Sequence, residues 1–324
     1  MMQSQKVLIT GADGFVGRIA SARLRAADCE TVRVVRKGGC SGDVVVGDLA
    51  AFEGWQPLLS GVDAVLHLAG RAHVIDEKAL DPLAEFRRTN VDATMRLAEA
   101  AARAGVHRFI FVSSIGVNGV QTGERPFSES DPPEPSEPYA LSKLEAEQGL
   151  ARIADHGAMQ VTRIRPPLIL GPGVKGNLLR LMRLVDRGIP LPFGAIRNRR
   201  SFIAVDDLCD LIYLCLGREG STNELFVAAS GEEISTPDLM HRIAAALGRA
   251  LWLVPVPMIW LRAAAGLTGT GPQFARLTSS LRVDASRART VLNWRPRTSL
   301  STAIRSMAET YLQEKKRECG IARP

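Results

Sequence analysis

Residues 6–26, KVLITGADGFVGRIASARLRA, pass from a short apolar strand through a glycine-rich turn into an amphipathic helix. The glycines stand at Gly11, Gly14 and Gly17. Gly11 permits a tight turn, Gly14 lets backbone N–H groups approach a pyrophosphate, and Gly17 lets the helix pack closely on the strand. The N-terminus of the helix then faces the negative charge. This order of strand, glycines and helix predicts a cradle for a dinucleotide.

The alternation of strand and helix continues through the first half of the chain. Further apolar, β-branched runs stand at 31–35, 43–49, 63–70 and 107–114, and a long helical pattern covers 81–105. Continuous apolar strands that alternate with helices are typical of a parallel sheet covered on both faces. The sequence therefore predicts an α/β fold built on a Rossmann doubly wound parallel sheet.

Composition and charge are those of a globular chain with a basic surface. Of the 324 residues, 46% are hydrophobic and 23% are charged, and the formal net charge is +7. The length leaves room for a large α/β domain and a smaller C-terminal domain. Nine basic residues and one acid, Asp186, lie between Arg163 and Arg200. No nucleic-acid motif accompanies them, so we expect a pocket for a small polyanion and no nucleic acid.

The longest apolar stretch, LWLVPVPMIWLRAAAGL at 251–267, is interrupted by Pro255, Pro257 and Arg262. It is too interrupted to cross a bilayer, and it predicts a packed helix after a proline-rich turn. The first residues, MMQSQKVLIT, lack the pattern of a secretory signal, and the five cysteines lack metal-ligand spacing. We therefore expect a cytoplasmic protein with reduced thiols, no bound metal and no membrane partner.

The residues that follow the strand at 31–35 select the cofactor. Sites for NAD commonly carry an acid at this point, which bonds the 2′-hydroxyl of the adenosine ribose. This chain offers Arg36 and Lys37 instead. Two cations favour a 2′-phosphate, so we predict NADP(H), with NAD as the alternative cofactor. The alternative for Arg36 and Lys37 themselves is a solvated surface pair.

A tyrosine precedes a lysine by four residues at two places in the chain. Tyr139 and Lys143 lie in SEPYALSKLEAEQ at 136–148, and Tyr311 and Lys315 lie near the C-terminus. This spacing puts both side chains on one helical face. An ammonium beside a phenol can lower the phenol pKa from about 10 and make it a proton donor at neutral pH. Spacing alone does not distinguish the two pairs.

Nine motifs occur in order along nearly the whole chain: TGADGFVG, GDL, HLAG, TNV, SSIGVNG, YALSK, RPPLILGPG, RSFIAVDDL and LNWRPR. In this combination the chain resembles the extended short-chain dehydrogenase/reductase family, which comprises nucleotide-sugar epimerases, dehydratases and reductases. The resemblance implies a nicotinamide cofactor, a UDP-sugar substrate and a smaller substrate-binding domain. The implied boundaries are 1–169 with about 201–235 for the NAD(P)-binding domain, and 170–200 with 236–324 for the substrate-binding domain.

The resemblance also assigns the chemistry to particular residues. Tyr139 and Lys143 fall on the family's active-site helix, and Ser114 falls on its serine or threonine, with Ser113 as the neighbouring alternative. These three, Ser114, Tyr139 and Lys143, are the expected catalytic residues. Tyr311 has no serine motif upstream and lies in a polar terminal tail, so we expect its pairing with Lys315 to be a chance spacing at the surface.

The remaining site residues are also implied by the resemblance. Those expected at the cofactor are Gly11, Gly14, Phe15, Val16, Gly17, Arg36, Lys37, Asp48, Leu49, Leu68, Ala69, Gly70, Asn90, Ser113, Tyr139, Lys143 and Pro166. Those expected at the substrate are Ser114, Asn118, Asn177, Arg199, Arg200 and Arg282. Forked guanidinium groups suit a diphosphate, although a solvated rim position is the alternative for Arg199. Asp206 and Asp207 are expected to cap the next helix.

Two departures from the family narrow the reaction. The 4,6-dehydratases follow the threonine with an Asp–Glu pair, and here those positions hold Ile115 and Gly116. Elimination of water is therefore not supported. Asn118 replaces a family tyrosine, which changes one substrate contact.

Three functions remain open at this point. RAHVIDE, SSIGVNG, GVKGN and NRRSF resemble bacterial UDP-N-acetylquinovosamine dehydrogenases of O-antigen (lipopolysaccharide) synthesis, which implies reduction of UDP-4-keto-6-deoxy-GlcNAc at C4. A UDP-glucose or UDP-N-acetylglucosamine 4-epimerase with bound NAD is the second hypothesis, and a non-catalytic NADP-binding regulator is the third. Because family members commonly dimerise through helices corresponding to about 90–104 and 138–153, we expect a homodimer.

Overall fold

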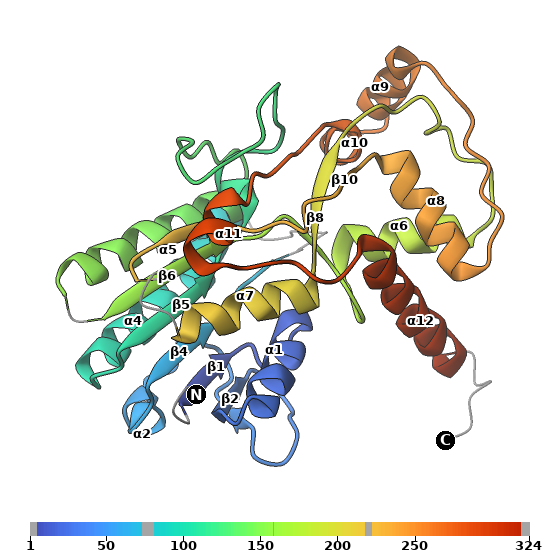
Figure 1. Ribbon diagram of the computed structural model, residues 1–324. Coiled ribbons are helices and arrows are strands. Elements are labelled where there is room, and N and C mark those ends of the chain that lie inside the picture. Colours follow the sequence, from blue (N-terminus) through green and yellow to red (C-terminus); the bar gives the residue numbers. More distant parts are fainter. Residues whose placement is uncertain (1–4, 73–80, 158, 218–221, 319–324) are drawn as a thin grey trace.

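A seven-stranded parallel sheet forms the centre of the computed structural model, which describes residues 5–72, 81–157, 159–217 and 222–318 (Figure 1). The strands run in the order β3-β2-β1-β4-β5-β6-β9. Their bounds are Lys6–Thr10 for β1, Glu30–Val35 for β2, Val44–Val45 for β3, Ala64–His67 for β4, Arg108–Val112 for β5, Gln160–Arg165 for β6 and Leu225–Val227 for β9. The order reverses between β1 and β4, and ligands of such sheets bind at the carboxyl ends of the strands beside the reversal. The predicted Rossmann fold is confirmed.

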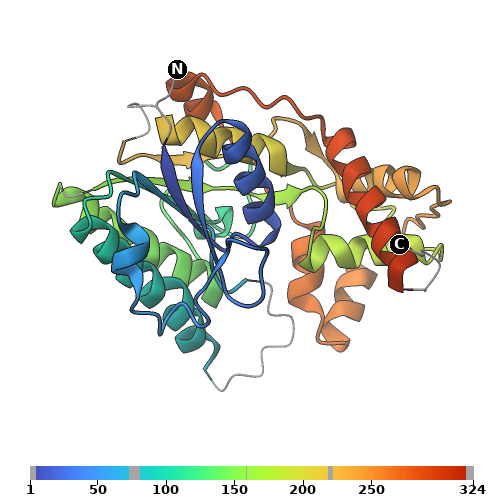
Figure 2. The ribbon, with the colours of Figure 1, turned by 90° about the horizontal axis from the view of Figure 1, so that it is seen from below.

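Alternate residues of the strands face two different helical layers. Val7 and Ile9 of β1 lie in the core beneath α1 (Phe15–Ala26) and α7 (Val205–Gly217). Leu8 lies in the core on the opposite face, where the covering helices are α2 (Trp55–Leu59), α4 (Ala93–Arg103) and α5 (Pro138–Asp155) (Figure 2). With both faces covered, a strand residue is buried whichever way it points. This burial explains why the strands are apolar without alternation.

The long helix expected at 81–105 is interrupted by one wider turn. It consists of α3 (Pro82–Arg87), the π-helical turn η1 (Arg88–Asp92) and α4. The side chain of Asp81 accepts a hydrogen bond from the Ala84 N–H and caps the start, with a proline at the first helical position. A single π turn rotates the residues after it relative to those before it, and such turns are frequent at functional sites. Here the turn contains the buried Asn90.

A smaller unit packs around a second, three-stranded sheet. Its strands are β7 (Leu168–Leu170), β8 (Arg200–Ala204) and β10 (Glu233–Ile234), in the order β10-β8-β7. Helices α6 (Gly176–Asp186), α8 (Thr236–Leu247) and α12 (Leu300–Glu318) share its apolar core. The sequence predicts a loop after β6, but β7 forms there, because the two prolines at 166–167 end one strand and the chain pairs next with β8.

Two expectations are wrong, namely the polar C-terminal tail and the capping of α7 by its two aspartates. The expected polar tail is the regular helix α12, whose buried side chains include Ile304 and Met307. Asp206 and Asp207 lie in the first turn of α7, after the N-cap position, so neither is its capping residue. The buried carboxylate of Asp207 accepts hydrogen bonds from the backbone N–H groups of Arg297 (2.8 Å) and Thr298 (3.0 Å) and so ties the LNWRPR segment to α7. Trp294 of the same segment is buried and donates to the Asp207 carbonyl (3.2 Å).

The apolar stretch at 251–267 forms a proline-rich segment and α9 (Met258–Leu267), as predicted, but the helix is not packed all round. Ala265 is its one buried residue. The neighbouring helices α10 (Gly271–Thr278) and α11 (Ser286–Leu292) complete the C-terminal part. Within the described residues, every helix is too short or too polar to cross a membrane.

Candidate active site

The glycine-rich turn lies at the carboxyl end of β1, directly against the end of β4. Gly11 has a φ of +65°, and a β-carbon on it would lie 2.9 Å from the Ala69 backbone nitrogen. A β-carbon on Gly17 would collide with the Gly11 carbonyl oxygen. Only glycine therefore lets α1 begin this close to the two strands. The turn leaves the N-terminal N–H groups of α1 at the edge where a pyrophosphate would be held.

The other residues expected along the dinucleotide line the same edge. Leu68, Ala69 and Gly70 continue from β4, and the Ala69 N–H donates to the Thr10 hydroxyl (3.2 Å). Phe15, at the start of α1, packs against both the large core and the smaller core. Val16 packs on the large core and Leu49 packs on the core of the opposite face. These apolar contacts fix the walls of the cradle.

A buried chain of hydrogen bonds holds β1, β4 and the π turn together. The His67 ring bonds the Thr10 hydroxyl through Nδ1 (2.7 Å) and the Thr94 hydroxyl through Nε2 (2.9 Å). Burial, with a smaller effect from the charge of Lys143, lowers the pKa of His67 to about 3. His67 is therefore neutral at pH 7, and its role is to bind the two threonines.

Asn90 is held in the same region by backbone and side-chain partners. Its amide donates to the Arg71 carbonyl (3.1 Å) and to the Ser142 hydroxyl (3.0 Å), and its Oδ1 accepts from the Arg71 N–H (2.7 Å). These bonds tie the segment after β4 to α5. A cofactor contact by Asn90 remains a prediction.

The two candidate serines follow β5. The Ser114 hydroxyl accepts from the Gly116 N–H (3.1 Å) and caps the short helix η2 (Ile115–Val117). The Ile115 N–H donates to the Pro166 carbonyl (3.0 Å), so the expected residue Pro166 anchors this turn. Ser113 is buried, and within the described residues its hydroxyl has no hydrogen-bond partner. A buried hydroxyl without a hydrogen-bond partner destabilises the fold, so a polar group of a bound ligand would satisfy it.

Tyr139 and Lys143 lie in the first two turns of α5. The helix begins at Pro138, whose fixed φ suits the first helical position. The Lys143 ammonium donates to the Val112 carbonyl at the end of β5 (3.0 Å) and lies 4.4 Å from the centre of the Phe111 ring. It is also 3.4 Å from the position that a β-carbon on Gly70 would occupy. The lysine therefore lies where the carboxyl ends of β4 and β5 meet.

Burial controls the pKa of both groups. It raises the pKa of Tyr139 to about 12 and lowers the pKa of Lys143 to about 8, the latter partly offset by the negative charge of Glu147. We expected Lys143 to lower the pKa of the Tyr139 phenol. Within the protein this expectation is wrong, because desolvation of the phenolate outweighs the effect of the lysine charge. Tyr139 is a protonated phenol at neutral pH.

The end of β2 combines an ion pair with two exposed cations. Arg33 forms an ion pair with Asp43 (2.6 Å) and donates to the Ala12 carbonyl in the glycine turn (3.3 Å). Arg36 and Lys37, just beyond, are exposed, and neither forms an ion pair within the described part of the chain. The Arg33–Asp43 pair was missed in the sequence because it joins β2 to a loop with no fixed spacing.

Asp48, expected at the cofactor, is held by the π turn. Its carboxylate forms an ion pair with Arg88 (2.5 Å) and accepts from the Ala50 N–H (3.1 Å). The hydrogen bond from Arg88 is the main reason that the pKa of Asp48 is lowered. The charge of Arg36 also lowers it, so Asp48 and Arg36 face the same region.

Two of the expected substrate arginines meet at a carboxylate that sequence reasoning missed. Glu233 accepts hydrogen bonds from Arg282 (3.0 Å to each oxygen) and forms an ion pair with Arg199 (3.2 Å). Arg200 points instead to the end of α10, where it donates to the Ser279 carbonyl (3.0 Å), and burial lowers its pKa to about 10. Asn177 is exposed near the start of α6.

Asn118 does not have a free amide for the substrate, contrary to the expectation. The side chain is buried, its Oδ1 accepts from Arg165 (2.9 Å), and its Nδ2 donates to the Ser128 carbonyl (3.1 Å). Arg165 also forms a two-pronged pair with Glu147 of α5. Where the family has a tyrosine, this chain thus has an internal link between η2, β6 and the active-site helix.

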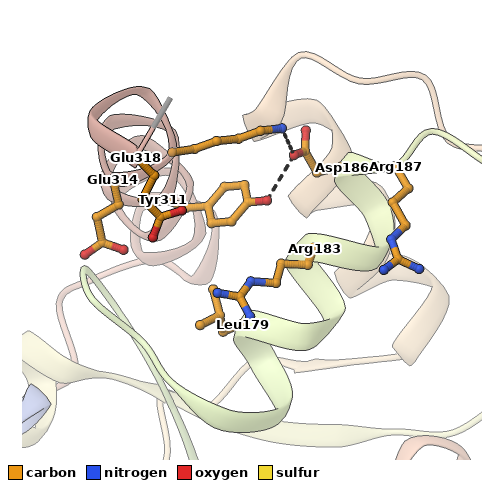
Figure 3. A pocket seen from close by; sticks show the side chains of 8 residues that line it. Leu179, Arg183, Asp186, Arg187, Tyr311, Glu314 and Glu318 are labelled. Carbon is orange, nitrogen blue, oxygen red and sulfur yellow. Dashed lines mark hydrogen bonds and ion pairs between the residues drawn. The ribbon is translucent and has the colours of Figure 1, made fainter. Parts of the chain in front are cut away.

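The second tyrosine–lysine pair, Tyr311 and Lys315, lies in the smaller unit and lines a pocket between α6 and α12 (Figure 3). The Tyr311 hydroxyl donates to Asp186 (2.9 Å), and Lys315 forms an ion pair with the same carboxylate. Arg249 pairs with the other oxygen of Asp186 (2.9 Å). The pair is therefore not a chance spacing at the surface. It attaches α12 to α6.

Comparison with known proteins agrees with this geometry. Residues 7–229 match the NAD dependent epimerase/dehydratase family, and the chain belongs to that family. It is therefore an enzyme of the nucleotide-sugar epimerases, dehydratases and reductases. Similar solved structures share the fold, and two of them hold NAD, which agrees with a cradle for a nicotinamide dinucleotide at the glycine turn.

Three similar proteins illustrate the range of activities in this group. A UDP-glucose 4-epimerase from Vibrio cholerae is 38% identical over 319 residues, which covers 97% of each chain. A GDP-6-deoxy-D-mannose reductase from Pseudomonas aeruginosa is 28% identical over 322 residues, 95% of this chain and 97% of that one. The solved structure of MoeE5 with UDP-glucose and NAD superposes with a TM-score of 0.78 at 26% identity, covering 96% of this chain and 99% of MoeE5.

Proposed function

We propose that the protein is an NADPH-dependent reductase of the C4 keto group of a UDP-4-keto-6-deoxy-hexosamine. The end of β2 carries this proposal. Asp43 is engaged by Arg33, which leaves no free acid there for a ribose 2′-hydroxyl within the described residues. Arg36 and Lys37 are exposed at the same end. Two exposed cations favour a 2′-phosphate, and a phosphorylated cofactor that exchanges with its pool suits net reduction.

The protein's own residues supply the proton and hold the carbonyl. The cofactor supplies the hydride when it is bound. Tyr139, protonated at neutral pH, donates a proton to the oxygen as it gains charge. The Ser114 hydroxyl bonds the same oxygen, and Lys143 holds the dinucleotide ribose at the carboxyl ends of β4 and β5.

The substrate residues are compatible with a diphosphate. Arg199 and Arg282 converge on one carboxylate, Glu233, so their charges are only partly neutralised. A nucleotide diphosphate can bond the remaining N–H groups of both forks. UDP is the favoured nucleotide because MoeE5 binds UDP-glucose and the V. cholerae relative acts on a UDP-sugar.

Arg36→Asp tests the cofactor preference. An aspartate here repels a 2′-phosphate and can accept a bond from a 2′-hydroxyl. We expect the Kd for NADPH to rise by about a hundredfold, while the Kd for NADH changes by less than about threefold. Fluorescence titration of the reduced nicotinamide measures both. The matched control is Arg103→Asp, an exposed arginine at the end of α4, which should alter neither value. Equal weakening of NADPH and NADH contradicts the NADPH proposal.

UDP-sugar 4-epimerisation is the second candidate, favoured by the 38% identity to the V. cholerae epimerase. An epimerase regenerates its cofactor in each cycle and retains it. The two candidates are separated by denaturing the purified protein, identifying any released dinucleotide, and assaying two reactions. Released NAD with conversion of UDP-glucose to UDP-galactose supports the epimerase. An empty site with NADPH-dependent loss of UDP-4-keto-6-deoxy-GlcNAc supports the reductase.

The pH dependence follows from the two active-site pKa values. The pKa of Lys143 is lowered to about 8 in the folded protein, below about 10.4 in an unfolded chain. The ammonium therefore keeps its charge below pH 8 and loses it above. Tyr139, with a pKa of about 12, stays protonated over the same range. We expect kcat/KM for NADPH to fall about tenfold per pH unit above about pH 8.

Lys143→Arg provides the check on this pH profile. A guanidinium remains charged throughout the range, so the fall should disappear even though the rate itself is lower. A wild-type profile that stays flat to pH 10 would show that Lys143 does not titrate as expected. The role in O-antigen synthesis, the cytoplasmic location, the homodimer and the domain boundaries remain predictions.

A further inference from the structure

The helix α9 lies at the outer end of the smaller unit (Figure 1), and its large apolar side chains are exposed. Ile259, Trp260 and Leu267 are 74%, 69% and 90% exposed. Ile259, Ala263 and Leu267 are spaced by four residues and Trp260 stands beside them, so they lie on one side of the helix. The buried Ala265 lies on the other side. Apart from Arg262 the helix carries only apolar residues and glycine, yet it is packed on one side only, which is unusual for a surface element.

The preceding segment extends this face. Leu191 pairs with the 252–254 backbone through two hydrogen bonds, its N–H to the Trp252 carbonyl and its carbonyl to the Val254 N–H, both 2.9 Å. Trp252 and Val254 are exposed, whereas the alternating Leu253 packs on the core. We call the exposed set the α9 patch, and its residues are Ile189, Trp252, Val254, Ile259, Trp260 and Leu267.

The concentration of these residues is not the usual scatter of surface apolar groups. Nine large hydrophobic residues are exposed in the described part of the chain, and six of them form the α9 patch. Two of the four tryptophans of the protein are among them. Exposed apolar residues that gather in neighbouring segments and include tryptophan are typical of a surface that another molecule or a membrane covers.

The charged residues in the sequence ranges around the α9 patch are all basic, although Arg199, Arg249, Arg276 and Arg282 pair with carboxylates from other segments. Residues 187–205 and 249–283 contain eight arginines, four in each range, and no aspartate or glutamate. Within the described residues, Arg187, Arg197 and Arg262 form no ion pair. Arg262 lies on α9 itself, and Arg187 lies two residues before Ile189. A second copy of the same face would bring these arginines against one another, which disfavours a symmetric contact.

We propose that the α9 patch docks the enzyme on the surface of an anionic lipid bilayer, without spanning it. Tryptophan and aliphatic side chains beside arginines are the pattern of a helix that lies in the headgroup region. The prolines and Arg262, which prevent 251–267 from spanning a bilayer, do not oppose this mode of binding. The proposal differs from the expectation of no membrane partner, and the vesicle experiment below decides between them.

The α9 patch is also connected to the catalytic helix. Arg276 of α10, the helix that follows α9, forms an ion pair with Glu137 (2.6 Å), the residue that directly precedes α5. This ion pair therefore joins the part of the chain that would dock to the start of the active-site helix. The proposal does not depend on whether the enzyme is a reductase or an epimerase.

The test is sedimentation of the full chain with vesicles of phosphatidylcholine alone and of phosphatidylcholine with phosphatidylglycerol at three to one. We expect the anionic vesicles to bind at least about tenfold more tightly, with binding weakened by salt. Ile259→Gln/Leu267→Gln should lower the partition coefficient by at least about tenfold. Val45→Gln/Val291→Gln, two exposed valines of the large unit, is the matched control and should leave binding unchanged.

Fluorescence provides an independent readout. Trp55 and Trp294 are buried, so an emission shift to shorter wavelength on adding anionic vesicles should come from Trp252 and Trp260 and be lost in Trp252→Phe/Trp260→Phe. Absence of vesicle binding overturns the proposal, as does equal binding to neutral and anionic vesicles. Light scattering gives a further outcome that overturns it. If the wild type binds no vesicles and Ile259→Gln/Leu267→Gln has a lower molecular mass than the wild type, the patch is a contact between copies of the chain.

Discussion

Tyr139→Phe should lower kcat by about a factor of 10²–10⁴, while the Kd for NADPH changes by less than about threefold. The variant removes one oxygen and keeps the ring, which packs edge-on against Phe86 with centroids 6.0 Å apart. Within the described residues the Tyr139 hydroxyl makes no hydrogen bond, so its removal leaves no buried partner unsatisfied. The loss should therefore appear in turnover and not in the stability of the fold.

The chain supplies its own control for this variant. Tyr311→Phe makes the same chemical change at the other tyrosine–lysine pair, where the hydroxyl bonds Asp186. We expect kcat to be unchanged and the free energy of unfolding to fall by about 1 kcal/mol. Steady-state assays and urea denaturation of both variants measure the contrast. Normal turnover in Tyr139→Phe would remove the phenol from the mechanism, and a similar loss in Tyr311→Phe would point to a general structural effect.

The features that local sequence could predict are those set by short spacing. The glycine turn, the apolar strands and the Tyr139–Lys143 pair each depend on residues within one or two turns of chain. The structure keeps them where local geometry puts them, with Gly11 at a positive φ and the lysine at the end of β5. The alternation of strands and helices predicts the parallel sheet, and the reversal of strand order at β1 and β4 agrees with the doubly wound fold.

What could not be predicted depends on partners far apart in sequence. Glu233 meets Arg282 across 49 positions, and Asp207 meets Arg297 across 90. No spacing rule connects such residues. Asn118 could not be placed for the same reason, because its amide is taken by Arg165 in another strand. The pKa of Tyr139 was misjudged because burial, which sequence does not report, outweighs the neighbouring charge.

A second large effect is expected where the active-site helix joins the sheet. The Arg165 guanidinium bonds both oxygens of Glu147, at 2.9 and 3.1 Å through Nε and 2.5 Å through Nη2. The two side chains are 5% and 2% exposed. Glu147 lies one helical turn after Lys143 on the same face of α5, so its carboxylate acts on the charge of Lys143. Removing either side chain leaves the charge of the other unpaired in the low-dielectric interior.

We expect Glu147→Gln and Arg165→Met each to lower the free energy of unfolding by about 3–5 kcal/mol. The double variant Glu147→Met/Arg165→Met should recover part of this loss, because no charge is then left unpaired. The matched control is Glu145→Gln, two residues earlier on the same helix. Its pair with Arg87 is 25% and 48% exposed, so its loss should cost less than about 1 kcal/mol. Urea denaturation measures all four.

The pH profile separates stability from catalysis in these variants. The charge of Glu147 raises the pKa of Lys143, so Glu147→Gln should move the fall in kcat/KM to a lower pH. Arg165→Met keeps the carboxylate, so the fall should not move down even though the fold is weakened to a similar extent. Equal losses of stability in Glu147→Gln and Glu145→Gln, or an unmoved profile in Glu147→Gln, would mean that the buried pair neither holds α5 in place nor sets the charge of Lys143.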